Sequence, residues 1–167
     1  MASAPPRLGP TARLVLWGRG LPVALTNRAV GLGLLLPTGT VLGIARALTP
    51  DPAGVGTHRQ LGLGPCLVLT LTGYPCPMCG MTTTFSLLAH GELLRAVCNQ
   101  PFGVVLFSIT AATAMVGAAD LLSGRGLWRR AFGQIERLET QIAVGLLMGL
   151  IAGWAYKIVL MKNFFMT

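Results

Sequence analysis

Three long apolar stretches dominate the hydrophobic pattern of the chain. They cover residues 29–48, 101–122 and 140–161. Each is close to the roughly 20 residues that a helix needs to cross a hydrocarbon core. The first contains Pro37 and ends near Arg46, whose side chain is long enough to reach the headgroups. The third carries Trp154, Tyr156 and Lys157 toward its end, as expected at a membrane interface. The pattern therefore predicts three transmembrane helices.

A further apolar segment, residues 60–100, lies between the first two spans and has a different pattern. From residue 60 through residue 91 it contains no Asp, Glu, Lys or Arg, yet prolines and glycines interrupt it repeatedly. Because each proline removes a backbone donor, a lipid-facing helix would be left with unpaired carbonyl groups. We therefore expect a re-entrant or interfacial helical segment here. A fourth span near residues 66–89 is the alternative.

The amino-acid composition supports a membrane protein. Of the 167 residues, 53% are hydrophobic and 11% are charged, whereas an ordinary soluble domain carries about 25% charged residues. The predicted fold class is an all-α integral membrane protein, with three transmembrane helices plus a re-entrant or interfacial helical segment that carries a CxxC motif. We expect one membrane domain at residues 29–167, preceded by a basic cytoplasmic tail at residues 1–28.

The basic residues predict how the chain is oriented. The net charge is +8, and residues 123–137, between the second and third spans, contain four arginines and one acid. Because cytoplasmic loops are rich in Lys and Arg, this loop and the N-terminal tail belong on the cytoplasmic side. The CxxC segment then lies on the non-cytoplasmic side, and we expect a bacterial inner membrane. The bilayer is the expected partner and other membrane proteins are candidates. No nucleic acid is expected, because no recognition motif accompanies the charge.

Two cysteines, Cys76 and Cys79, form the CxxC motif within "GYPCPMCGMTTTF". If a helix begins at Gly80 or Met81, its free N–H groups and positive dipole end stabilise a thiolate. One hypothesis is a disulfide or redox pair, which an oxidising compartment would permit. A second is half of a tetrahedral zinc site. A third is a pair of small thiols that pack at a turn.

A zinc site here would need two further ligands, and Cys66 and His58 precede the motif in the same segment. No cofactor is expected from the pattern, although zinc is possible through these four residues. We interpret the threonines at 82–84 as caps for free donors of the first helical turn. His90 and Glu92 are close enough in sequence to handle protons together, but solvated surface residues are the simpler interpretation.

The stretch "GYPCPMCGMTTTFSLLAHGELLRAVCNQPFG" resembles a widespread bacterial membrane family, domain of unknown function 2752. That family's pattern runs roughly C-P-x-C-G-x-T, then an apolar helix, a Gly-Asp/Glu turn, an Ala, and Asn-Pro at the next span. The matching positions are Cys76, Pro77, Cys79, Gly80, Thr82, Gly91, Glu92, Ala96, Asn99 and Pro101. Two departures are Thr83, where many members carry Arg, and Gln100, which is inserted before Pro101. The resemblance implies a membrane protein and no particular reaction.

Three functional hypotheses follow, and the favoured one is non-enzymatic. A membrane scaffold or accessory subunit would use the glycine-rich spans "GLGLLLPTGTVLG" and "GLLMGLIAG" for close contact with partner helices. The first alternative is a thiol-disulfide relay in which Cys76 attacks and Cys79 resolves. The second alternative is a metal-binding module that uses the same two cysteines.

Overall fold

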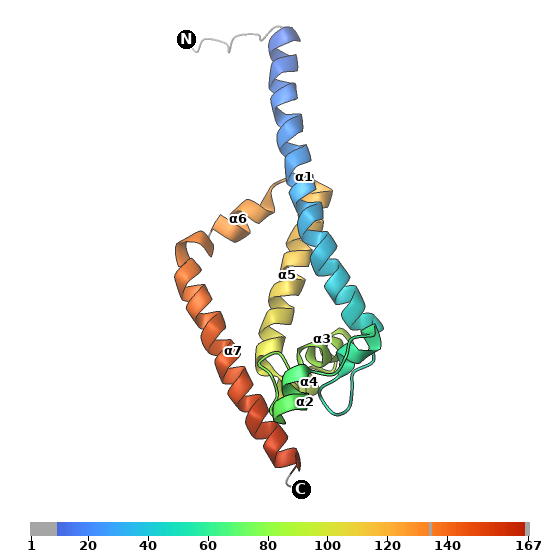
Figure 1. The fold of residues 1–167 in the computed structure, drawn as a ribbon. Helices are drawn as coiled ribbons and strands as arrows, with labels where there is room; N and C mark the ends of the chain where they lie inside the picture. The colour runs from blue at the N-terminus through green and yellow to red at the C-terminus, as the bar shows by residue number, and fades with distance from the viewer. Residues whose placement is uncertain (1–9, 134, 166–167) are drawn as a thin grey trace.

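The computed structural model describes residues 10–133 and 135–165, all of whose regular elements are helical (Figure 1). The elements are α1 (Pro10–Ala47), the 3-10 helix η1 (Thr57–Leu61), α2 (Leu67–Thr72), α3 (Met81–Ala89), α4 (Leu93–Asn99), α5 (Pro101–Ser123), α6 (Leu127–Gly133) and α7 (Ile135–Phe165). Three helices contain segments long and apolar enough to cross a membrane, at Val23–Ala47, Pro101–Ser123 and Leu138–Lys162. The predicted all-α fold with three such helices is confirmed.

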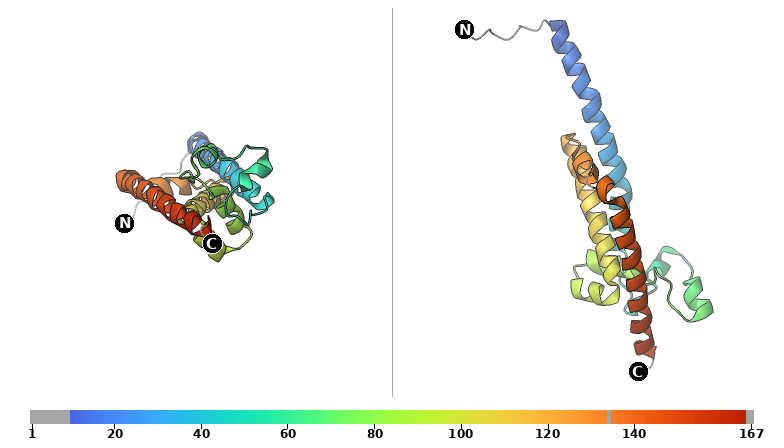
Figure 2. Two further views of the ribbon diagram at one scale, coloured as in Figure 1. Left: turned by 60° about the horizontal axis from the view of Figure 1, so that its bottom comes forward. Right: turned by 90° about the vertical axis from the view of Figure 1, so that its left-hand side faces the viewer.

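The first long helix begins earlier than the sequence pattern indicates. It starts at Pro10, inside the segment expected to be a tail, and it continues through Pro37 to Ala47. Figure 2 shows the N-terminal part of α1 extending past the end of α5 where α6 lies.

The short helices between α1 and α5 gather at one end of the long helices (Figures 1 and 2). Helices α2 and α3 have 6 and 9 residues, far fewer than the roughly 20 that a span requires. The chain leaves α1 and enters α5 at this same end. The arrangement is therefore that of a segment which returns to the side it came from, and we call this end of the molecule the motif end.

Helices α1 and α5 cross at two glycines. A Cβ atom added to Gly31 would lie 2.8 Å from the Gly117 carbonyl oxygen, and one added to Gly117 would lie 2.8 Å from the Gly31 carbonyl oxygen. The absence of side chains at both positions lets the two backbones touch. Such small-residue crossings provide close packing where lipid supplies no hydrophobic driving force.

Helix α7 diverges from α1 and meets the rest of the chain near the motif end (Figure 1). Phe102 of α5 packs on Gly149 and Gly153, since a Cβ at either glycine would lie 2.9 Å from a Phe102 carbon. Trp154 Nε1 donates to the Pro75 carbonyl at 2.7 Å, and the Tyr156 hydroxyl donates to the Cys98 carbonyl at 2.7 Å. Helix α7 is thereby joined to the segment that carries the cysteines.

At the opposite end of the long helices, Asp120, the one acid of the second span, has a structural role. Its carboxylate is buried and accepts the backbone N–H groups of Leu127 and Trp128 at 2.6 and 2.7 Å. Both donors belong to the first turn of α6, whose N–H groups have no partner within the helix. Asp120 therefore sets the direction in which the chain leaves α5.

The α1–α5 crossing predicts opposite outcomes for two neighbouring glycines of α1. Gly31→Val should lower the free energy of unfolding by about 1–3 kcal/mol, the usual cost of overpacking a close contact. Gly33→Val is the matched control, because a Cβ there meets nothing within 4 Å. Chemical unfolding in detergent, followed by circular dichroism, measures both. Equal losses in the two variants would contradict this account of the crossing.

Candidate functional site

The CxxC motif forms the turn that leads into α3. The Cys79 N–H donates to the Cys76 carbonyl at 3.0 Å, and the Met81 N–H donates to the Met78 carbonyl at 3.1 Å. Gly80 precedes the helix with φ of +88°, a left-handed conformation that favours glycine. The helix begins at Met81, as the sequence indicates. Its start brings the two cysteines to one side of a tight turn.

Three cysteine sulfurs meet at this turn. Cys76 Sγ lies 3.3 Å from Cys79 Sγ, and Cys79 Sγ lies 3.4 Å from Cys66 Sγ. All three sulfurs lie within 4.8 Å of one another. Cys66 reaches the cluster because it directly precedes α2, which folds back beside the motif. These three cysteines, the thiol cluster, are close enough to hold a metal ion, whereas Cys98 is exposed and outside it.

His58 is the fourth residue that the sequence suggests as a ligand, and it does not join the thiol cluster. Its Nε2 atom instead lies 3.2 Å from the Gly64 carbonyl oxygen. It does line the same cavity of about 270 Å³ as the three cysteines, together with Arg59 and Thr82. The structure therefore brings together three of the four predicted ligands and places the fourth on the wall of their cavity.

The pKa values of Cys79 and Cys66 are shifted in opposite directions, by different causes. Burial raises the pKa of Cys79 to about 12, and the neighbouring thiols of Cys76 and Cys66 act in the same direction. A backbone hydrogen bond from Leu69 lowers the pKa of Cys66, outweighing the effect of its slight burial. A buried thiol of this kind gives up its proton when a cation neutralises the resulting charge. Without such a cation, the raised pKa keeps Cys79 a neutral thiol near neutral pH.

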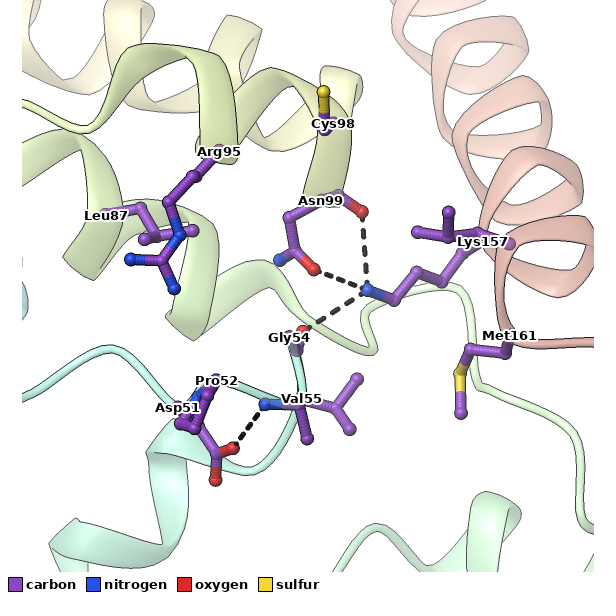
Figure 3. Close-up of a pocket in the computed structure, with 12 residues that line it drawn as sticks. Asp51, Pro52, Gly54, Val55, Leu87, Arg95, Cys98, Asn99, Lys157 and Met161 are labelled. Carbon is purple, nitrogen blue, oxygen red and sulfur yellow. Dashed lines mark hydrogen bonds between the residues drawn. The ribbon is translucent and has the colours of Figure 1, made fainter. Parts of the chain in front are cut away.

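A buried lysine lies beside the thiol cluster, and the sequence pattern did not single it out. Lys157 was expected at the membrane interface, but its side chain points inward and is 2% exposed. Its Nζ atom donates to Asn99 Oδ1 at 2.6 Å, to the Gly54 carbonyl at 3.2 Å and to the Asn99 carbonyl at 3.3 Å (Figure 3). The interfacial interpretation is wrong for Lys157, because three oxygens inside the protein replace water around its ammonium group.

Asn99 connects this lysine to the cysteine turn. Its Nδ2 atom donates to the Gly80 carbonyl at 3.2 Å and to Thr84 Oγ1 at 3.0 Å, while its oxygens accept from Lys157. These contacts give Asn99 a structural role at the cysteine turn. Figure 3 shows the Lys157 ammonium nitrogen between Asn99 and the loop at Gly54, and all three residues line a cavity of about 350 Å³.

The threonines after the motif are not helix caps. The residue that precedes α3 is Gly80, which has no side chain to cap the helix. Thr83 and Thr84 are buried instead. Thr83 Oγ1 lies 2.8 Å from Thr57 Oγ1, and Thr84 accepts the hydrogen bond from Asn99. The capping interpretation is wrong for these two residues because their hydroxyls join separate parts of the chain, a role that local sequence does not reveal.

His90 and Glu92 do not face each other as a proton-handling pair. His90 Nδ1 lies 2.8 Å from the Ser86 carbonyl oxygen and Nε2 lies 2.9 Å from Arg46 Nη1. Glu92 pairs with Arg95 on the surface. Both residues lie away from the thiol cluster, at the turn between α3 and α4.

Three other residues of the motif segment lie at this turn and at the entry to α5. Gly91 adopts a left-handed φ of +81°, Ala96 is fully buried and Pro101 is the first residue of α5. Gln100 has an extended φ of −158° and is the single residue between α4 and α5. It therefore serves as the linker between the two helices.

The comparison with protein families gives one match. Residues 66–114 match the model of a family described as a protein of unknown function (DUF2752). The matched segment contains the thiol cluster and Asn99 but neither His58 nor Lys157. No curated protein matches the chain, and no solved structure matches it.

The geometry at Gly80 predicts a specific effect of adding one methyl group. A Cβ at Gly80 would lie 2.8 Å from the Gly54 carbonyl oxygen and 3.0 Å from Lys157 Nζ. We expect Gly80→Ala to destabilise the fold by about 1–3 kcal/mol through backbone strain and overpacking. Gly73→Ala is the control, because it has the same left-handed backbone and nothing within 4 Å. Thermal unfolding in detergent measures both, and equal shifts would contradict the role of close packing.

The unequal acidity of the thiols predicts the order in which they react. Alkylation requires the thiolate, so a thiol whose pKa is raised stays protonated and unreactive until the pH approaches that pKa. In chelator-treated protein, iodoacetamide should therefore modify Cys66 at lower pH than Cys79. Peptide mass spectrometry across a pH series measures both sites, and exposed Cys98 reports that the reagent is active. Faster modification of Cys79 than of Cys66 near neutral pH would contradict the assignment.

Proposed function

We propose that the chain is a membrane metal-binding protein, from the thiol geometry of the segment that matches the DUF2752 model, residues 66–114. Cys66, Cys76 and Cys79 hold one soft divalent ion, with zinc as the first candidate, because thiolates are the preferred ligands of such ions. The centre lies at the motif end, next to the membrane. We place the protein in a bacterial inner membrane, with its N-terminus in the cytoplasm and the centre on the other side.

The observation that carries this proposal is the position of Cys66. A disulfide-exchange motif needs two sulfurs, and the CxxC supplies both. The third sulfur, 3.4 Å from Cys79, has no part in such an exchange but is what a metal ion requires. Zinc–sulfur bonds of about 2.3 Å put tetrahedral thiolates about 3.8 Å apart. The Cys76–Cys79 and Cys79–Cys66 sulfur separations of 3.3 and 3.4 Å are somewhat shorter than that value, and all three sulfurs lie within 4.8 Å of one another.

The cluster supplies three ligands, so the fourth position is open to exchange. The three cysteines line a cavity of about 270 Å³ whose wall also includes His58 and Arg59, so a further ligand would have room to approach. Zinc sites with three protein ligands and one exchangeable position bind water or a substrate there, whereas structural sites close all four. The geometry therefore supports a centre that can take up a further ligand, rather than one that only stabilises the fold.

A thiol-disulfide relay is the second candidate, supported by the 3.3 Å between Cys76 Sγ and Cys79 Sγ. In this reaction the Cys76 thiolate attacks a partner's disulfide and displaces one partner thiolate. Cys79 then attacks the mixed disulfide, which yields an oxidised Cys76–Cys79 pair and a reduced partner. The raised pKa of Cys79 opposes the second step, because the resolving group must be a thiolate. We therefore place the relay behind metal binding.

A scaffold role rests on different residues. Gly31 and Gly117 are used within the chain, but a Cβ at Gly33, Gly43 or Gly145 would meet nothing within 4 Å. These positions leave the surfaces of α1 and α7 open to a partner helix. Co-purification of membrane partners, lost on substitution of these glycines by valine, would favour this role.

Metal analysis of single-cysteine variants tests the proposal. Purified wild-type protein should contain about one zinc ion per chain, and Cys66→Ser should lose most of it, as should Cys76→Ser and Cys79→Ser. Cys98→Ser is the control, because that thiol is exposed and outside the cluster. Retention of zinc by Cys66→Ser at the control level would overturn the proposal. A Cys76–Cys79 disulfide in thiol-trapping gels of the native membrane would favour the relay instead.

A further inference from the structure

Lys157 is a buried cation without an acidic partner. Among the residues that the structure describes, Arg95 and Glu92 form an ion pair, and no carboxylate lies within ion-pair distance of Lys157. Its three N–H groups are all accepted by neutral oxygens of Asn99 and Gly54. Hydrogen bonds of this kind replace the lost water but do not cancel the charge. A buried charge is costly unless it is also paired, so the structure calls for a negative group nearby.

The thiol cluster becomes negative when its sulfurs bind a metal ion as thiolates, and the residue that follows Cys79 contacts Lys157. Gly80, which directly follows Cys79, is so close that an added Cβ would lie 3.0 Å from Lys157 Nζ. Three thiolates around a divalent ion carry a net charge of −1. One buried ammonium group beside them brings the sum to zero.

We infer that Lys157 is the charge-compensating residue of a three-thiolate metal centre and that it sets the affinity of this centre for divalent ions. The inference rests on the proposed metal-binding function and goes beyond it, because it brings α7 into the centre. Lys157 touches neither sulfur nor metal in this role. It acts by lowering the electrostatic cost of gathering three anionic ligands in a site of low dielectric.

The surrounding contacts hold the ammonium group at this distance. Asn99 accepts from Lys157 through two oxygens and donates to the Gly80 carbonyl from its amide nitrogen. A single side chain thus links the cation to the turn that carries Cys79. Of the other charged side chains, Arg59 lines the cavity of the thiol cluster, while Asp51 and Arg95 line the cavity beside Lys157. Asp51 is engaged in its own loop, where Oδ1 accepts the Ala53 N–H at 2.9 Å.

The test compares cadmium and zinc affinity in full-length protein purified in detergent. Thiolate-to-cadmium charge-transfer absorption measures cadmium binding directly, and zinc is measured by competition. Lys157→Gln keeps a hydrogen-bonding amide but removes the charge, and Lys157→Arg keeps the charge. Lys162→Gln is the matched control, since it removes an exposed cation from the same helix, one that lies over the Tyr74 ring.

We expect Lys157→Gln to weaken cadmium binding about 10- to 100-fold, the range found when outer partners of metal ligands are removed. Lys157→Arg and Lys162→Gln should stay within about threefold of wild type by the same measure. Wild-type affinity in Lys157→Gln would overturn the inference and leave the metal-binding proposal intact. An equal loss of cadmium affinity in Lys157→Gln and Lys157→Arg would also overturn it, because Lys157 would then act through its shape and packing and not through its charge. If the wild type binds no cadmium or zinc, the proposed function and this inference both fail.

Discussion

The contact between Lys157 and Asn99 is the interaction on which the motif end depends. Lys157 belongs to the last helix, Asn99 ends α4, and the remaining acceptor is Gly54 in the loop after α1. Three parts of the chain that are remote in sequence therefore share one buried ammonium group. In surroundings of low dielectric, each of these hydrogen bonds is stronger than in water, and losing one leaves a polar group unpaired. These hydrogen bonds of Lys157 thus join α7 to the segment that carries the cysteines.

Two glycines allow the close packing around Lys157 and Asn99. Gly54 and Gly80 both have left-handed backbone conformations, and a side chain at either position would collide with atoms of Asn99 or Lys157. Gly80 faces the Gly54 carbonyl, Lys157 and Asn99 at once. Their role differs from that of Gly31 and Gly117, which let two long helices touch. Glycine therefore allows left-handed backbone conformations at the motif end and close helix packing between the spans.

The broad fold could be predicted because its causes are local. A run of about 20 apolar residues has one stable solution in lipid, and the prolines of residues 60–100 exclude a long helix there. The resemblance to the DUF2752 family is confirmed by the family match over residues 66–114. The start of α1 at Pro10 could not be predicted, because the apolar pattern weakens among the arginines although the helical backbone continues.

The sequence predicted one part of the candidate site, the pair of CxxC cysteines, more firmly than the rest. The CxxC spacing places Cys76 and Cys79 together through a single turn, and that follows from local geometry. The inclusion of Cys66 and the separate position of His58 depend on how α2 folds back, which no spacing rule determines.

By itself, the sequence determined three apolar helices, a broken segment between the first two and a pair of neighbouring thiols, because each of these follows from residues close together in the chain. Only the tertiary structure decided that a third thiol joins the pair and that Lys157 faces inward. A lysine near the end of a membrane helix can reach the headgroups or turn into the protein. The choice depends on oxygens from Gly54 and Asn99, which long-range packing brings to the same place.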